Sequence, residues 1–447
     1  MNKPIHQKSF AYNSLRELII LSMRIFHRKI TVEGQENIPD NMPTVFVLNH
    51  QNALIDALAL SVLRKQQVFM ARSDVFKNST AAKFLRKIKI LPIYRIRDGI
   101  KSLKNNDAVF EEAIGVLEGK KTLGILPEGN HFGHKRLRVL KKGIARIVFK
   151  AEERNDFKLN VQIIPVGLDY SKYSNFGGRL LVNIGKPFTI SSYKEEYLVN
   201  EQKGMNSFMQ ELRTKLLPQM LNINDSDNYD GIKALVDFYS LKKGKNTYKK
   251  NGHLSIVKFQ QSLSDKIISL KETNLDDFTS IVEKGNKINE AVKKLKFRQW
   301  VLKKEKYSPL SIFTSRFLQI LFFPIYLYGF IANIIPFQLP TYLSRNVKDP
   351  QFLASFRMVL GLVTFIVSYL ITFILLLIFI KCKLLALAVF ISIPLTGLLS
   401  FKYYVWFKKT SAKFRNNRLR RKQNSDWLAM RKNWNEVIDF LETNLKA

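Results

Sequence analysis

Residues 45–58 read VFVLNHQNALIDAL and decide the fold class of the chain. Thr44 to Leu48 is an apolar, β-branched run of the length of a buried strand, and the polar residues after it indicate where the strand stops. Ala53 to Val62 then has the composition of a helix. Polar groups at the carboxyl end of a buried strand occupy the edge where α/β sheets collect ligand-binding and catalytic side chains. We therefore expect a functional turn here.

His50 and Asp56 are the candidate catalytic pair of this turn. A continuous helix would place residues six apart about 120° from each other around its axis, so His50 must lie in the turn to meet Asp56. There the carboxylate can accept one imidazole N–H and leave the other ring nitrogen as a general base. The alternative is a loop histidine and a helical aspartate without a catalytic role.

Strand-like and helix-like runs alternate from Ile30 to Phe188. The alternation predicts an α/β domain, a mixed sheet with helices on its faces. The predicted strands are 45–48, 67–70, 89–93, 123–126, 161–166 and 180–184, and the predicted helices include 80–87, 105–118 and 143–153.

Four stretches of this domain resemble, in order, the blocks of the glycerolipid acyltransferase family. They are Asn49-His50 with Asp56, Ile93-Tyr94-Arg95, Leu126-Pro127-Glu128-Gly129, and Ile163-Ile164-Pro165-Val166. The resemblance covers about residues 32–188 and implies a glycerol-phosphate acyltransferase-like fold. It also implies transfer of a fatty acyl group from acyl-CoA or acyl-carrier protein to glycerol 3-phosphate or lysophosphatidate.

The resemblance also implies roles for particular side chains. His50 would take the proton of the acceptor hydroxyl, and Asp56 would orient the imidazole. Arg95 would clamp the acceptor phosphate, because a guanidinium offers two parallel donors. The implied substrate-binding residues are Asn49, Arg95, Arg97, Glu128, Gly129 and Pro165.

Two departures from the family pattern stand out. Five residues separate His50 from Asp56, where the commonest family form has four and a branch related to fungal glycerol-phosphate acyltransferases has five. The third block lacks the arginine expected after Gly129. The candidate replacements for that positive charge are Lys135, Arg136 and Lys142.

Other chemistries lack their motifs. The chain has no Gly-x-Ser-x-Gly elbow and no Gly-x-x-x-x-Gly-Lys-Ser/Thr loop. His131 and His134 could suggest a pair of metal ligands, but Gly133 between them argues against a helix that presents both, and no third ligand is evident. The single Cys382 excludes a cysteine-based zinc site and an intramolecular disulfide. We expect neither a metal nor a cofactor beyond the acyl thioester.

The net charge of +36 over 447 residues requires an anionic partner. The strongest cluster, Lys408 to Lys422, follows apolar segments, which favours the anionic lipid of a bilayer over nucleic acid. Asn13 to Lys29 mixes apolar and basic residues and is too short to span, so we expect an interfacial helix rather than one packed on the domain.

The predicted organisation has five parts. These are an N-terminal interfacial amphipathic helix (1–31), the acyltransferase domain (32–220), a charged helical segment (221–308), a membrane region with hydrophobic helices (309–407), and a basic tail with an amphipathic helix (408–447). The tail helix, with Trp427 and Trp434 on one side, is expected to attach to anionic lipid.

Three apolar runs, 312–337, 359–380 and 384–399, raise the question of topology. A cytoplasmic catalytic domain and a cytoplasmic basic tail require an even number of crossings. Pro324, Pro336 and Arg316 make the first run the weakest, so we expect it to be a broken or re-entrant element before a membrane hairpin. The functional alternatives are acylation of another lipid, such as an aminoacyl lipid, and a non-catalytic membrane scaffold.

Overall fold

The computed structural model describes the chain except for residues 1–4, 6–9, 64–66, 77, 95–103, 130–132, 174, 251, 348–351 and 446–447. The described chain divides into two compact units. The first contains Met1–Asn222 and Val347–Ser355, and the second contains Ile223–Asn346 and Phe356–Ala447.

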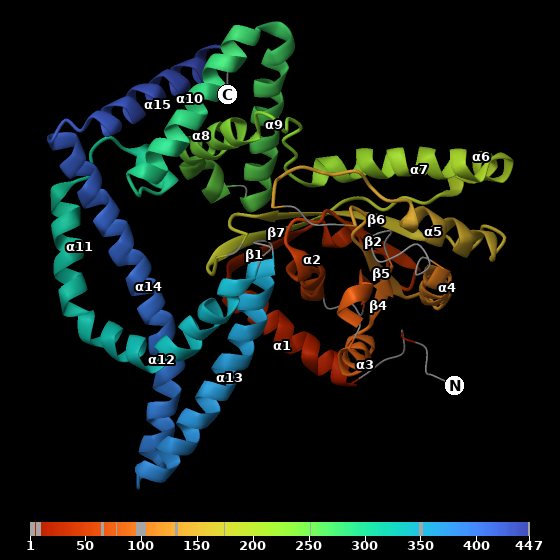
Figure 1. The fold of residues 1–447 in the computed structure, drawn as a ribbon, viewed down its shortest axis with the longest axis horizontal. Coiled ribbons are helices and arrows are strands. Elements are labelled where there is room, and N and C mark those ends of the chain that lie inside the picture. The colour runs from red at the N-terminus through yellow and green to blue at the C-terminus, as the bar shows by residue number, and fades with distance from the viewer. Residues whose placement is uncertain are drawn as a thin grey trace. The chain divides into compact units, whose positions relative to one another are not determined.

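The first unit is built on a seven-stranded mixed sheet (Figure 1). Its strand order is β1-β7-β6-β2-β5-β3-β4, and β6 with β7 is its antiparallel pair. The predicted α/β class is therefore confirmed. The strands are β1 (His27–Glu33), β2 (Thr44–Leu48), β3 (Gln67–Arg72), β4 (Ile90–Ile93), β5 (Thr122–Ile125), β6 (Gln162–Tyr170) and β7 (Gly178–Ile184).

Alternation along the strands divides their side chains between the two faces of the sheet. Val45 and Val47 of β2 join one buried cluster together with Leu123 of β5 and Ile163 of β6. Helices α4 (Asn105–Glu118), α5 (Gly143–Glu153) and α7 (Glu201–Leu216) contribute their apolar stripes to the same cluster. This unit also contains α1 (Phe10–Phe26), α2 (Ala53–Ala59), α3 (Ser79–Lys87) and α6 (Lys194–Val199).

The N-terminal helix α1 (Phe10–Phe26) packs on the first unit by one face, although the sequence favoured an interfacial helix. Ile20, Met23 and Phe26 are buried, whereas Leu21 and Ile25 are each about half exposed. The chain then enters β1, which pairs in parallel with β7. This strand crosses residue 31, so the predicted boundary between residues 31 and 32 falls inside an element of the sheet.

The second unit is helical. Its first helix, α8, begins at Tyr229, and Asp225 in the residues before it is buried and paired with Lys271 at 2.6 Å. Its helices are α8 (Tyr229–Lys250), α9 (Gly252–Thr273), α10 (Leu275–Lys294), α11 (Pro309–Leu321), α12 (Phe323–Leu343), α13 (Leu353–Phe379), α14 (Lys383–Arg421) and α15 (Ser425–Thr443).

Helix α15 buries the apolar face that was expected to attach to lipid. Trp427 and Trp434 are 3% and 4% exposed, and the ring of Trp434 meets Phe238 of α8 edge-on at 6.2 Å. Ion pairs Lys284–Glu436 and Lys294–Asp426 join α15 to α10. The predicted role of this face as a lipid anchor is wrong in this arrangement, because protein already covers it.

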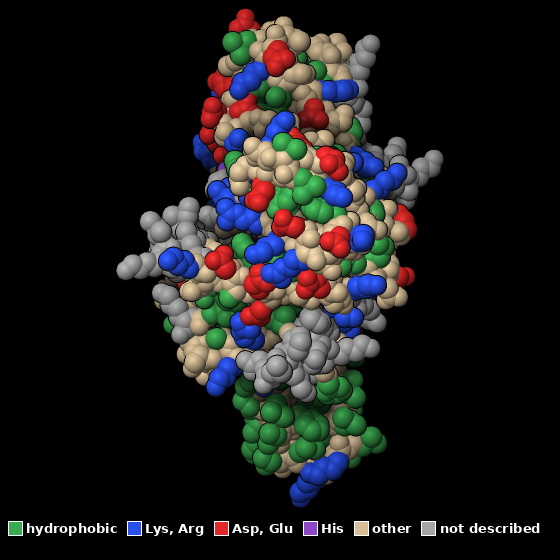
Figure 2. Space-filling view, turned by 90° about the vertical axis from the view of Figure 1, so that its right-hand side faces the viewer, with side chains coloured by type: hydrophobic (Ala, Val, Ile, Leu, Met, Phe, Trp, Pro, Cys, Tyr) green, Lys and Arg blue, Asp and Glu red, His purple; other side chains and the backbone are tan. Residues whose placement is uncertain are grey.

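Helices α13 and α14 are long and apolar enough to cross a membrane, as judged by length and composition. Figure 2 shows hydrophobic side chains gathered over this hairpin, with Lys and Arg side chains at its tip. Helices α11 and α12 form a pair bent by 59°, which could be a broken span or a re-entrant loop. The bend falls at Phe322, just before Pro324. Pro336, the other proline that weakens this run as a span, lies inside α12.

Polar contacts join the apolar helices to one another. The amide of Asn333 on α12 donates to the Ile393 carbonyl of α14 at 3.0 Å and accepts from the Tyr369 hydroxyl of α13 at 2.7 Å. Gly329 lies against Thr396, and Gly397 lies against Asn333, so α12 and α14 approach closely. Small residues combined with interhelical hydrogen bonds are the means by which helices associate in lipid.

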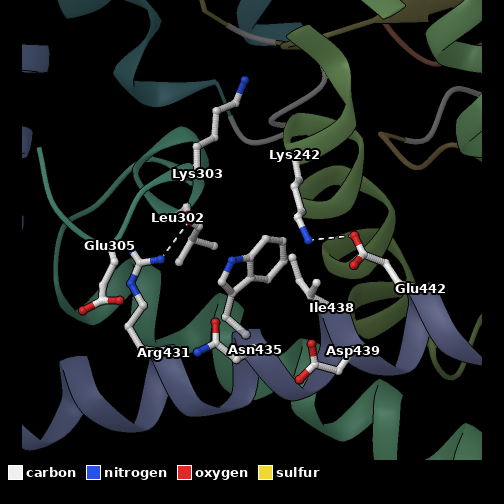
Figure 3. A pocket seen from close by; sticks show the side chains of 10 residues that line it. Lys242, Leu302, Lys303, Glu305, Arg431, Asn435, Ile438, Asp439 and Glu442 are labelled. Atoms are coloured by element: carbon white, nitrogen blue, oxygen red, sulfur yellow. Dashed lines mark hydrogen bonds and ion pairs between the residues drawn. The ribbon is translucent and has the colours of Figure 1, made fainter. Parts of the chain in front are cut away.

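A cavity of about 430 Å³ lies within the second unit, between α15, α8 and the turn after α10 (Figure 3). Lys242 pairs with Glu442 at 2.7 Å across it. Arg431 donates to the carbonyls of Leu302 and Val301 at 2.8 and 3.3 Å, which fixes the turn. Three cationic and three anionic side chains line the cavity, so its charge singles out no class of ligand.

Candidate active site

Three neighbouring parallel strands bring the candidate residues to one edge of the sheet. β2 lies between β6 and β5 and pairs in parallel with both. The chain leaves β2 towards β3 and β4 on one side and crosses later to β6 on the other, so β2 is a topological switch point. His50 follows β2, Glu128 follows β5, and Tyr170 ends β6. Carboxyl ends at such a point are where α/β sheets bind ligands.

His50 and Asp56 meet as the sequence predicted. Nδ1 of His50 lies 2.8 Å from Oδ2 of Asp56. The Asp56 side chain is fully buried and that of His50 is 15% exposed. A carboxylate only accepts hydrogen bonds, so Nδ1 carries the proton and Nε2, on the far side of the ring, points away from Asp56 as an acceptor. This is the arrangement that a general base requires.

Asp56 is held by the turn that it helps to form. Its Oδ2 also accepts the backbone N–H groups of Gln51 and Asn52 at 2.7 and 2.6 Å. These groups precede the first turn of α2, where the helix dipole favours a negative side chain. Ala53 has a φ of 44°, a left-handed conformation that is rare outside glycine. Strained backbone of this kind is characteristic of functional turns.

Side-chain amides tie the same turn to β6 and to the residues after it. Asn49 is fully buried; its amide donates to the Leu168 carbonyl at 3.1 Å, and its oxygen accepts the Leu168 N–H at 2.7 Å. Asn49 therefore extends the β2–β6 pairing beyond the strand. Asn52 donates to the Tyr173 carbonyl at 3.0 Å. The structure gives Asn49 a positioning role, and its contact with substrate stays a prediction.

Glu128 touches the backbone of the histidine itself. Its Oε1 accepts the N–H of His50 at 2.7 Å, and its Oε2 accepts the N–H of Arg138 at 3.2 Å. Burial raises the pKa of Glu128 to about 7, and the two N–H donors oppose that rise only in part. Each carboxylate oxygen retains a second lone pair that could accept from a substrate hydroxyl. The predicted contact of Glu128 with the acceptor therefore stays a prediction.

The Leu126-Pro127-Glu128-Gly129 block is a tight turn that aims Glu128 at His50. The N–H of Gly129 donates to the Leu126 carbonyl at 3.2 Å. Gly129 has a φ of 64°, which favours glycine, and an added Cβ would meet only Lys141 at 3.5 Å. Conformation, rather than space, therefore explains the glycine.

The three cations proposed to replace the missing arginine have different environments. Lys135 is buried and pairs with Asp169 of β6 at 2.6 Å, so its charge is already neutralised. Lys142 donates to Gln202 at 3.1 Å on the surface. Arg136 is half-buried. Lys135 is thus a structural residue, and Arg136 keeps its candidacy for an anionic ligand.

Of the other predicted site residues, the structure describes only Pro165. Pro165 is buried inside β6 opposite Val47, and its carbonyl accepts the Gly185 N–H at 2.8 Å. Arg95 and Arg97 lie outside the described residues. Among the described residues, no group of three or more His, Cys, Asp and Glu side chains could hold a metal ion.

Tyr170 is a site residue that sequence reasoning missed. Its hydroxyl donates to Oδ1 of Asp56 at 2.7 Å, and the side chain is buried. The predicted strand ended at Val166, whereas β6 continues to Tyr170. The run GLDY after Val166 was the available signal, since it continues the alternation of a strand to the edge where His50 lies.

Comparisons with known proteins point to the same region. A family model described as "Acyltransferase" matches residues 29–169. A 1-acyl-sn-glycerol-3-phosphate acyltransferase of Bacillus subtilis (strain 168) is 25% identical over 215 residues, which are 46% of this chain and 97% of the relative. The crystal structure of the 1-acyl-sn-glycerophosphate acyltransferase PlsC from Thermotoga maritima aligns over 47% of this chain and 86% of its own, with 20% identity and a TM-score of 0.31.

Proposed function

This chain belongs, through its first unit, to the glycerolipid acyltransferase family, and from that premise we propose that it transfers a fatty acyl group from a thioester to the hydroxyl of a glycerol phosphate acceptor. The observation that carries the proposal is the His50–Asp56 pair at the carboxyl end of β2. The acceptor is lysophosphatidate or glycerol 3-phosphate, and the donor is acyl-CoA or acyl-carrier protein.

The reaction needs one proton relay. Nε2 of His50 takes the proton of the acceptor hydroxyl as its oxygen attacks the thioester carbonyl carbon. The carbon–sulfur bond then breaks, and the imidazolium returns the proton to the leaving thiolate. Asp56, fixed by its hydrogen bonds, stabilises the imidazolium while it exists. No covalent enzyme intermediate is required, since the base acts directly on the acceptor.

Glu128 contributes by holding the backbone of the base. Its contact with the His50 N–H holds the backbone of the residue whose imidazole Asp56 holds. A catalytic base must be held to within a fraction of an ångström, since a misplacement of about 1 Å costs about 10²-fold in rate. The His50 turn is therefore supported from both β5 and α2.

The second unit would attach the enzyme to the bilayer that holds its lipid substrate or product. Helices α13 and α14 supply two apolar segments of sufficient length. Their connection contains Lys381 and Lys383, and the far end of α14 carries Arg418, Arg420 and Arg421. The larger positive charge favours the cytoplasmic side for the end of α14. We propose a hairpin anchor with the catalytic unit on the cytoplasmic face.

A matrix of two acceptors and two donors tests the proposal. Purified full-length protein is incubated with glycerol 3-phosphate or lysophosphatidate and with acyl-CoA or acyl-carrier protein, and acylated product is quantified. We expect turnover in at least one combination. Turnover in none of them, together with acylation of an aminoacyl lipid supplied in parallel, would contradict the proposal.

Arg95→Lys tests the predicted phosphate clamp in the same assay. A lysine keeps the charge but cannot offer two parallel donors, so the Michaelis constant of the phosphorylated acceptor should rise well beyond that of the acyl donor. Equal effects on donor and acceptor would count against the clamp. Arg136→Lys, assayed alongside, measures the contribution of the second candidate cation.

A further inference from the structure

The side of Asp56 remote from His50 is occupied by Tyr170. The tyrosine hydroxyl donates to Oδ1, while Oδ2 receives His50 Nδ1 and two turn N–H groups. Asp56 therefore accepts four hydrogen bonds, three on the oxygen that faces the catalytic turn and one on the other. The bond from Tyr170 restrains rotation of the carboxylate about its Cβ–Cγ bond from the Oδ1 side.

We propose that Tyr170 is a positioning residue for acyl transfer, whose hydroxyl fixes the Asp56 carboxylate and through it the His50 imidazole. The inference rests on the proposed function, because it assigns Tyr170 a role only if His50 is the base. Tyr170 ends β6, and Leu168 of the same strand anchors Asn49. One strand thus positions the catalytic turn and the carboxylate together.

The surroundings of Tyr170 keep it a neutral donor. Burial, aided by the charge of Asp56, raises the pKa of Tyr170 well above its ordinary value. The titratable groups nearby are Asp56, Asp169, Tyr173 and His27, and Asp169 is paired with Lys135. The ring of His27 lies 6.0 Å from that of Tyr170, and neither His27 nitrogen has a hydrogen-bond partner among the described residues. The phenol is therefore a neutral donor to Asp56.

Removing the hydroxyl should change chemistry and leave binding intact. Tyr170→Phe keeps the buried ring but leaves Oδ1 without its donor, so the carboxylate and the imidazole gain freedom. We expect kcat to fall about tenfold, and less than on loss of the base. The Michaelis constants of both substrates should stay within about twofold of wild type, since Tyr170 lies behind Asp56.

The pH profile gives a readout that a purely structural role would not move. The phenol hydrogen bond withdraws negative charge from the carboxylate. Without it, the carboxylate attracts a proton on the imidazole more strongly, and the acid limb of kcat should move to higher pH. Glu128, the other carboxyl beside His50, is unchanged by the substitution and so cannot cause the difference between variant and wild type.

Tyr197→Phe is the matched control. Tyr197 is also a buried tyrosine of the first unit, stacked on Phe149 at 4.3 Å, but it belongs to α6 and not to the site. Each variant and His50→Ala are purified as full-length protein, the folded fraction is measured by circular dichroism, and rates are expressed per folded enzyme.

The outcomes separate the two claims. A lower kcat with unchanged Michaelis constants and a shifted acid limb in Tyr170→Phe, with Tyr197→Phe near wild type, supports the inference. If Tyr170→Phe keeps the kcat and the pH profile of the wild type while His50→Ala is inactive, the inference about Tyr170 is wrong and the proposed function stands. The inference is also overturned if Tyr170→Phe only lowers the amount of folded protein, so that its rate per folded enzyme and the acid limb of its pH profile match the wild type. An active His50→Ala overturns the proposed function itself.

Discussion

Replacing Glu128 by glutamine should make the first unit more stable at alkaline pH while lowering its activity. Glu128 is 3% exposed, and its pKa rises from an ordinary 4.5 to about 7. Between these values the unfolded chain loses the proton and the folded chain keeps it, so the contribution of Glu128 to stability falls as pH rises. At about 1.4 kcal/mol for each pH unit, the loss comes to about 3 kcal/mol.

Glutamine resembles the protonated carboxyl and does not titrate. Relative to the wild type, the variant should therefore gain about 3 kcal/mol of stability between pH 4.5 and pH 8. Its activity should fall nevertheless, because the amide can accept only one of the two N–H groups that Glu128 accepts, from His50 and Arg138. Substitutions that raise stability at a functional site commonly lower activity.

The assay must report on the first unit alone. All four tryptophans, Trp300, Trp406, Trp427 and Trp434, lie in the second unit, so tryptophan fluorescence would miss the effect. Hydrogen exchange of peptides from β2 and β6 gives the free energy of opening of the sheet, and comparison at equal pH cancels the intrinsic exchange rates. The exposed Glu195, replaced by glutamine, is the control. A difference that does not depend on pH, or a variant less stable at pH 8, would refute the reasoning.

Three further predictions use other contacts. Burial lowers the pKa of His27 to about 4 from 6.5, so the contribution of His27 to stability falls by about 3 kcal/mol as pH falls through this window, opposite in sign to that of Glu128. The difference in stability between His27→Phe and the wild type should therefore shift by about 3 kcal/mol towards the variant as pH falls, in the same exchange experiment, and a difference independent of pH would exclude His27 as the cause. Lys135→Met leaves the buried Asp169 carboxylate without its partner and should lower the free energy of unfolding by about 3–5 kcal/mol. A second substitution, Asp169→Asn, should restore a large part of that stability, and no recovery would mean that the unpaired charge is not the cause of the loss. Cys382 is exposed between α13 and α14, so a maleimide that cannot cross the membrane should label it from the non-cytoplasmic side if these helices form a hairpin. Protection of Cys382 together with exposure of a tag at Ala447 would mean that all three apolar runs cross.

The sequence predicted those parts of the fold whose signals are local. β2, its polar turn and the His50–Asp56 contact followed from an apolar run, a turn and one spacing argument. β1 was missed because His27–Glu33 mixes charged and apolar residues, and the strand exists only because β7 offers it a partner. Pairing between distant segments has no local signature, which is why strand propensity depends on context.

The positioning contacts of the site were harder to predict for the same reason. Glu128 was expected at the acceptor, but its bonds to His50 and Arg138 join residues 78 and 10 positions away. The amphipathic pattern of α15 was predicted correctly, yet a pattern does not say what covers an apolar face. Here α8 and α10 cover it, as the contacts of Trp434 and Glu436 show.

The most direct test of the account is acyl transfer by His50→Ala, measured with full-length protein on the best acceptor and donor pair from the substrate matrix. Loss of the general base should lower kcat by about 10²–10⁴-fold. The β2 and β6 peptides should keep their protection from exchange, and His253→Ala, a buried histidine of α9, should retain activity. If His50→Ala turns over at a rate near wild type while remaining folded, the assignment of His50 as the base is wrong.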